Sequence, residues 1–223
     1  MVTVESLIFN KVPVGAPVPG ETLKKVTSEL DVDNAPLDGG ILVKTHALDL
    51  SPYMRGRMRA PGKKSYTPEF PLGKPLTSHM VAKVVRSDSA DFQAGDVVYG
   101  YGEHSTYAVI PKAALGGLKK LDNAAGIALH TYVGAAGMPG QTAHYGLSLG
   151  RPKEGETIFV SSAAGAVGQI VVQLAKQRGL KVIGSAGDAK KVAFLKELGV
   201  DVAFNYKEED LAKVLDEHPI DIL

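Results

Sequence analysis

The chain has 223 residues, of which 44% are hydrophobic, which is enough for a packed core and for two domains. Its 25 Lys and Arg nearly balance its 24 Asp and Glu, which argues against a basic field for nucleic acid or for an anionic membrane surface. The absence of cysteine excludes disulfides, thiolate zinc ligands and a thiol nucleophile.

The first apolar stretch, Leu7-Ile8-Phe9, is flanked by Glu5 and Lys11 and is too short for the core of a signal peptide. No other run approaches the length of a transmembrane helix. We therefore expect a cytoplasmic protein.

Residues 1–125 are predicted to form a small, mostly β domain. Turn residues separate short β-forming runs at 41–44, 80–85, 96–99 and 107–110. Near residue 125 these short β-forming runs end, and we place the domain boundary there.

Residues 126–223 are predicted to form an α/β domain. From residue 140 on, strand and helix patterns alternate at the spacing of βαβ units, which indicates a parallel sheet with helices on its faces. The strands are expected at 157–162, 180–186, 200–206 and 220–223, and the helices at 167–178, 189–198 and 208–216.

Small residues fill the turn between the first of these strands and its helix. The turn reads Ala163-Ala164-Gly165-Ala166-Val167-Gly168. In a dinucleotide site the chain turns tightly at the first position, approaches a pyrophosphate at the third, and lets helix and strand touch at the last. The free N–H groups at the helix start then hold the anion. Ala163 replaces the usual first glycine. The prediction of a dinucleotide site therefore depends largely on the βαβ pattern around the turn.

The end of the second strand, Gly184-Ser185-Ala186-Gly187, bears on the choice of cofactor. An NAD site usually places an acid about 20 positions after the first glycine, to hold the ribose 2′-hydroxyl. Here no carboxylate stands at the strand tip, and Lys190 and Lys191 follow on a helix that we expect Asp188 to cap. The pattern favours NADPH over NADH.

Two alternatives remain open in this region. Lys191 is the stronger candidate for the 2′-phosphate, whereas Lys190 is equally well explained as part of a solvated helix face. Tyr206, at the end of the third strand, either lies beside the adenosine or is half-buried packing.

Four segments carry a family resemblance, namely 50–58, 137–143, 157–178 and 202–207. With them the sequence resembles the zinc-independent medium-chain dehydrogenases and reductases, and among these the prostaglandin reductases and alkenal double-bond reductases. The resemblance implies an α/β protein with an N-terminal GroES-like substrate domain and a partial Rossmann domain that binds NADP(H). It also implies hydride transfer to the β-carbon of an α,β-unsaturated aldehyde or ketone.

The resemblance also assigns roles to single residues. It implies a pyrophosphate turn at Ala164, Gly165, Ala166 and Val167, with Ala163, Gly168 and Gly187 completing the cofactor site. Lys191 and Tyr206 correspond to the pair that recognises the 2′-phosphate, and Met138 and Thr142 to residues near the nicotinamide. Tyr53 corresponds to a substrate-pocket residue whose hydroxyl holds the carbonyl, and we expect a structural role for Arg55.

No metal is expected, because the six histidines show no ligand spacing. The expected partner is a small unsaturated carbonyl compound, with no nucleic acid and no membrane. A homodimer is the candidate oligomer, although this chain is expected to lack the family's usual interface. Compared with the family, the chain is expected to be C-terminally truncated. Two functions therefore stay open: an NADPH-dependent ene-reductase, or a catalytically inactive NADPH-binding or interaction protein.

Overall fold

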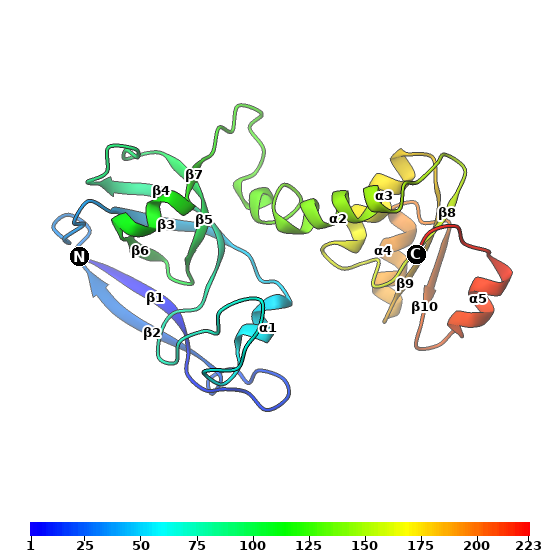
Figure 1. Ribbon diagram of the computed structural model, residues 1–223, viewed down its shortest axis with the longest axis horizontal. Helices are drawn as coiled ribbons and strands as arrows, with labels where there is room; N and C mark the ends of the chain where they lie inside the picture. The colour runs from blue at the N-terminus through cyan, green and yellow to red at the C-terminus, as the bar shows by residue number, and fades with distance from the viewer. The chain divides into compact units, whose positions relative to one another are not determined.

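The computed structural model describes residues 1–223, which form two compact units, residues 1–133 and 134–223 (Figure 1). The boundary therefore follows residue 133, whereas the sequence pattern placed it after residue 125. The difference arises because the 3-10 helix η2 (Leu129–Val133) packs against strands β3 (Ile41–Leu48) and β4 (Thr77–Ser87) of the first unit.

The N-terminal unit is mostly β, as expected. Its main sheet is antiparallel with the order β6-β3-β4-β5-β7, where β5 is Val97–Glu103, β6 is Tyr107–Ile110 and β7 is Lys119–Lys120. The strands predicted at 41–44, 80–85, 96–99 and 107–110 are confirmed as parts of β3 to β6. A separate antiparallel pair, β1 (Val2–Phe9) with β2 (Leu23–Leu30), was not predicted. Besides η2, the helices of this unit are α1 (Tyr53–Arg57) and the 3-10 helix η1 (Lys112–Gly117).

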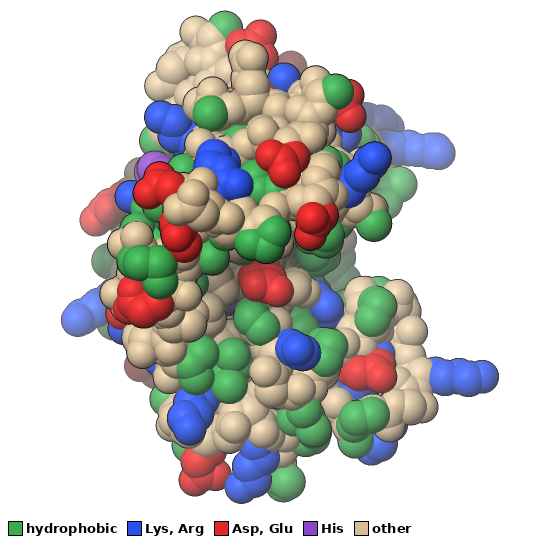
Figure 2. All heavy atoms as spheres, turned by 90° about the vertical axis from the view of Figure 1, so that its left-hand side faces the viewer, with side chains coloured by type: hydrophobic (Ala, Val, Ile, Leu, Met, Phe, Trp, Pro, Cys, Tyr) green, Lys and Arg blue, Asp and Glu red, His purple; other side chains and the backbone are tan.

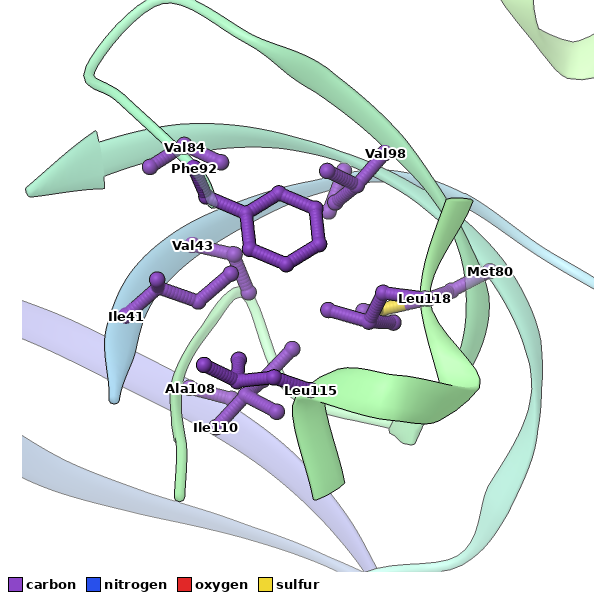
Figure 3. Packing of buried hydrophobic residues seen from close by; sticks show 11 residues of the cluster. Ile41, Val43, Met80, Val84, Phe92, Val98, Ala108, Ile110, Leu115 and Leu118 are labelled. Atoms are coloured by element: carbon purple, nitrogen blue, oxygen red, sulfur yellow. The ribbon is translucent and has the colours of Figure 1, made fainter. Parts of the chain in front are cut away.

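One face of the five-stranded sheet carries the main hydrophobic core of this unit (Figure 3). Alternate residues of each strand point to this face, so that Val43, Met80 and Val98 lie together, and Leu115 and Leu118 cover them. Burying each of the large side chains contributes about 1.5–3 kcal/mol. The opposite face of the same strands is free to carry other side chains, and several of them are polar.

The C-terminal unit is a parallel sheet with helices on both faces. Its strands β8 (Thr157–Val160), β9 (Lys181–Ala186) and β10 (Val202–Asn205) have the order β10-β9-β8, and Ile222 forms a parallel bridge with Ile158. Side chains of α2 (Met138–Leu149), α3 (Gly168–Gln177) and α4 (Ala189–Glu197) pack on one face, and those of α5 (Leu211–Glu217) pack on the other. The predicted βαβ alternation is confirmed for the first three strands, whereas the strand predicted at 220–223 forms only the isolated bridge at Ile222.

Charged side chains of both signs are interspersed over the face of the N-terminal unit that Figure 2 shows, with no large region of one sign. This agrees with the near balance of acidic and basic residues in the sequence. None of the helices combines the length and the apolar character that crossing a membrane requires.

Candidate functional site

A recess of about 230 Å³ lies in the C-terminal unit, at the carboxyl ends of its parallel strands. Ligands of open α/β sheets bind at this edge. The residues that line it come from the segments that follow β8, β9 and β10, and they are Ser162, Ala164, Gly165, Ala186, Gly187, Asp188, Lys191, Tyr206 and Lys207. The structure therefore brings together Ala164 and Gly165 of the glycine turn with Gly187, Lys191 and Tyr206, whereas Ala166 and Val167 of the predicted turn do not line the recess.

The turn after β8 presents unpaired backbone donors. The N–H groups of Ala164, Ala166 and Val167 donate to no atom of the chain, whereas Gly165 donates to the carbonyl of Ser162 at 2.8 Å. The left-handed residue of the turn is Ser162, with φ 48°, so the chain reverses one residue before Ala163. Free N–H groups just before a helix form a concave donor set suited to a phosphate oxygen.

Ala163 and Gly168 lie beneath this turn and do not line the recess. Ala163 is fully buried, and its N–H donates to the carbonyl of Ser185 at 2.9 Å, which ties the turn to β9. A Cβ at Gly168 would lie 2.7 Å from the Ala163 Cα. Helix α3 thus begins so close to Ser162 and Ala163 of the preceding turn that only glycine fits at position 168.

Asp188 caps helix α4, as the sequence predicted. Its Oδ1 accepts a hydrogen bond from the N–H of Lys191 at 2.9 Å, and its Oδ2 lies 3.4 Å from the Lys191 Nζ. These contacts, the backbone one first, hold the pKa of the Asp188 carboxyl below its usual value. Lys190 does not line the recess, whereas Lys191 does. The carboxylate is therefore engaged by the helix start and by a lysine.

Tyr206 and Lys207 close the recess from the end of β10. The Tyr206 N–H donates to the carbonyl of Ala186 at 3.2 Å, and a Cβ at Gly187 would meet the Tyr206 hydroxyl oxygen at 2.7 Å. The Lys207 N–H donates to the Asn205 Oδ1 at 3.2 Å. Lys207 was missed in the sequence, where it reads as one more charge before a solvated helix. Its place in the recess follows from the parallel pairing of β9 and β10.

The remaining predicted cofactor residues lie elsewhere. Met138 and Thr142 are on α2, where the Thr142 hydroxyl donates to the Met138 carbonyl at 2.8 Å, and neither lines the recess. Arg55 donates twice to the carbonyl of Gly15, at 2.6 and 3.1 Å, and so ties α1 to a loop. Its contacts agree with the structural role that we expected.

Tyr53 begins helix α1 in the N-terminal unit. Its hydroxyl is buried and has no hydrogen-bond partner. Burial, and then the neighbouring Tyr101, raise the pKa of this hydroxyl above its ordinary value, so it stays protonated at neutral pH. A buried donor without a partner is rare in a folded protein, and it is chemically suited to bind a carbonyl oxygen.

Four of the six histidines are exposed, His79 is half-buried and His104 is buried. No group of three or more His, Asp or Glu side chains is arranged to hold a metal ion.

Comparisons with known proteins match this chain to oxidoreductases. A family model described as the N-terminal domain of oxidoreductase matches residues 5–118, and one described as zinc-binding dehydrogenase matches residues 166–220. An NADP-dependent oxidoreductase of Cochliobolus heterostrophus is 43% identical over 95% of this chain and 60% of its own length. The NADP(+)-dependent 2-alkenal reductase of Nicotiana tabacum is 45% identical over 86% of this chain and 55% of its own.

A solved structure is also similar to this chain. CurA from Vibrio vulnificus, in complex with NADPH, superimposes with a TM-score of 0.79 at 32% identity, covering 96% of this chain and 61% of that one. The chain thus spans about three fifths of the length of these relatives.

Proposed function

Because the chain belongs to the medium-chain dehydrogenase and reductase family of oxidoreductases, we propose that it binds NADPH and takes part in reducing unsaturated carbonyl compounds. The proposed substrates are α,β-unsaturated aldehydes or ketones, whose C=C bond is reduced. The names of the relatives support the cofactor, and the tobacco 2-alkenal reductase supports the substrate class.

The observation that carries the cofactor proposal is the recess at the strand tips. It is lined by Lys191, Lys207 and Tyr206, and by Ala164, whose backbone N–H has no partner in the chain. The only acid that lines it, Asp188, is occupied by the helix start. These residues fit the adenosine end of NADPH, with the 2′-phosphate near the lysines and the pyrophosphate at the turn.

The chemistry of the reaction needs few protein groups. When bound, NADPH would supply the hydride that adds to the β-carbon. As this happens, negative charge develops on the substrate oxygen, and a positioned hydrogen-bond donor stabilises that charge. We assign this role to the Tyr53 hydroxyl, which is buried, protonated and without a partner in the chain.

Replacing Lys191 by Ala tests the cofactor assignment. Losing a charge-assisted contact to the 2′-phosphate should weaken NADPH binding by about 1–3 kcal/mol and leave NADH binding nearly unchanged. Lys190→Ala is the matched control, because Lys190 is adjacent but lies outside the recess. Binding is measured as thermal stabilisation, since a ligand at about 100 times its Kd adds roughly 2.7 kcal/mol. Equal losses for both cofactors would show that Lys191 does not read the 2′-phosphate.

NADPH consumption with a simple 2-alkenal tests the reaction itself. Turnover is expected if the proposal holds. Saturable NADPH binding without turnover would instead favour the binding or interaction protein that the sequence left open.

A further inference from the structure

Ser162 is the only residue of the recess with a left-handed backbone. Its φ of 48° lies in a region that residues with a Cβ rarely adopt. Two other non-glycine residues of the chain share this conformation, Asp38 and Arg151, and neither lines the recess. Such strain persists only where the surrounding structure maintains it, and it gathers at ligand sites. The turn after β8 therefore keeps a side chain at a position where glycine would be less strained.

Close packing holds Ser162 in this conformation. Its carbonyl oxygen accepts the Gly165 N–H at 2.8 Å, and a Cβ at Gly168 would lie 2.6 Å from the same oxygen. The next N–H, that of Ala163, donates to the carbonyl of Ser185 in β9 at 2.9 Å. Both polar atoms of the peptide group that follows Ser162 are therefore engaged, so this peptide cannot rotate to relieve the strain.

These contacts also fix where Ser162 lies in the recess. Through the Ala163 N–H it is tied to the end of β9, one residue before Ala186, which lines the recess together with Gly187. Ser162 is also the first residue of the turn that presents the free N–H of Ala164. It is thus linked to the donor of the turn on one side and to the tip of β9 on the other.

Two side chains line the recess with a hydroxyl group, and they come from different strands. Ser162 follows β8 and Tyr206 follows β10, and β9 lies between these two strands in the sheet. Ser162 is exposed, and its hydroxyl makes no hydrogen bond within the chain. It is therefore free to bind a ligand on the side of the recess that faces away from Tyr206 and Lys207.

The chemistry of the cofactor indicates which group this hydroxyl meets. In the adenosine half of NADPH, the ribose joins the 5′-pyrophosphate to the 2′-phosphate, and its free hydroxyl is the one at the 3′ position. With the pyrophosphate at the turn and the 2′-phosphate near the lysines, the sugar lies at the tip of β9. An NAD site would offer an acid there, but position 187 is glycine and the Asp188 carboxylate is engaged by Lys191. A serine hydroxyl can both donate and accept, so it suits this group.

We propose that the Ser162 hydroxyl binds the 3′-hydroxyl of the adenosine ribose and so contributes to the affinity for NADPH and NADH alike. The inference rests on the proposed cofactor and deepens it, because it assigns a residue to the sugar. It also accounts for the strain, since glycine would relieve the backbone at position 162 but would carry no hydroxyl.

The first test compares Ser162→Ala with Ser162→Gly in the full chain. Both variants lose the hydroxyl, whereas only glycine relieves the backbone. Both should bind NADPH and NADH about threefold to tenfold more weakly than wild type, the usual effect of losing a neutral hydrogen bond. Ser162→Gly should nevertheless unfold at a higher urea concentration than Ser162→Ala. Calorimetric titration and urea unfolding measure these quantities.

Ser161→Ala is the matched control, because Ser161 is adjacent and exposed but does not line the recess. It should bind both cofactors as wild type does. Wild-type affinity in the two Ser162 variants would overturn the inference. A loss that Ser162→Gly does not share would assign the effect to the backbone, and a loss confined to NADPH would assign it to the 2′-phosphate. Either result would also overturn it.

The second test removes the partner hydroxyl from the ligand. The probes are ADP and 3′-deoxy-ADP, which differ only in the 3′-hydroxyl. Wild type should bind 3′-deoxy-ADP about threefold to tenfold more weakly than ADP, whereas Ser162→Ala should bind the two equally. The same preference for ADP in both proteins would show that another group holds the 3′-hydroxyl.

The outcomes distinguish this inference from the proposed function. If Ser162→Ala removes the preference for ADP but wild type binds NADH as well as NADPH, the inference stands and the NADPH proposal fails. If Lys191→Ala weakens NADPH binding while the Ser162 variants behave as wild type, the NADPH proposal stands and the inference fails. A chain that binds neither ADP nor NADPH would refute both.

Discussion

His104 is the histidine of the N-terminal unit that is shielded most completely from water. It is 5% exposed, and its Nε2 shares a hydrogen bond of 2.8 Å with the hydroxyl of Ser78, which is fully buried. Burial lowers the pKa of His104 from 6.5 to about 4. The folded protein therefore holds this imidazole in its neutral form over most of the accessible pH range.

This shift predicts a loss of stability in mild acid. In the unfolded chain the imidazole takes up a proton below pH 6.5, whereas in the folded chain it does so only near pH 4. The stabilisation is therefore complete above pH 6.5, falls as the pH drops toward 4, and is constant below that. The total is about 3 kcal/mol. Urea unfolding at pH 7.5 and 4.5 measures it.

The control for this prediction is His46→Gln, which should keep the acid dependence because His46 is exposed. His104→Gln should lose most of it, whatever its stability at neutral pH. The same acid dependence in His104→Gln and wild type would show that another group is responsible.

At the scale of single elements, the start of α4 combines two roles. Asp188 caps the helix through the Lys191 N–H, and its carboxylate also lines the recess and contacts the Lys191 side chain. Capping needs only an oxygen acceptor, whereas binding a 2′-phosphate is opposed by the negative charge. Replacing the Asp188 carboxylate by an amide therefore separates the capping role from the effect of the charge.

Asp188→Asn should strengthen NADPH binding several-fold and leave NADH binding unchanged. Its free energy of unfolding should stay within about 0.5 kcal/mol of wild type, because Asn caps as well as Asp. Asp188→Ala removes both the charge and the cap, and should cost about 1 kcal/mol of stability. Calorimetric titration and urea unfolding measure these quantities. A loss of NADPH affinity in Asp188→Asn would mean that the carboxylate helps to place Lys191.

The strands β8 to β10 and the helices α3 to α5 of the C-terminal unit could be predicted because their signals are local, whereas helix α2 was not predicted. The buried strand, the glycine turn and the helix follow one another within one short stretch, and residues such as Leu195 and Leu198 mark the inner face of α4. The pair β1 and β2 was missed because neither strand has a clear alternating pattern, and their pairing joins residues 2–9 to residues 23–30. Such a register depends on the tertiary fold.

The site residues also differ in whether their sequence signals are local or depend on the tertiary fold. The turn at Ala164 and Gly165 is visible in the sequence, because glycine and alanine there have a steric reason. Ser162 and Lys207 reach the recess only through the parallel pairing of β9 with β8 and β10, and no spacing in the chain marks them. Ser162 accordingly reads as the last residue of a strand, whereas β8 ends at Val160.

At the scale of the whole molecule, the two proposed sites belong to different units. The recess with Lys191 and Tyr206 is built entirely from residues after 133, and Tyr53, which we propose binds the substrate oxygen, belongs to the unit before it. Each unit also has its own hydrophobic clusters. The affinity for the adenosine end of the cofactor should therefore be a property of the C-terminal unit.

This separation can be tested with 2′,5′-ADP, which carries the 2′-phosphate but no nicotinamide. Tyr53→Phe should bind it with the Kd of wild type, whereas Lys191→Ala should bind it about tenfold or more weakly. Fluorescence or calorimetric titration of the full chain gives the values. A Kd that changes more than about threefold in Tyr53→Phe would reveal coupling between the units.

The contact of Gly187 with Tyr206 limits how this protein can evolve. An acidic side chain at position 187 would suit the ribose hydroxyls of NADH, yet even its Cβ would lie 2.7 Å from the Tyr206 hydroxyl oxygen. Such a mutant must move the Tyr206 ring, which costs little because the hydroxyl is the far end of a side chain that is 51% exposed. The same movement would take the tyrosine from its place in the recess, so a change at position 187 alters both contacts to the cofactor at once.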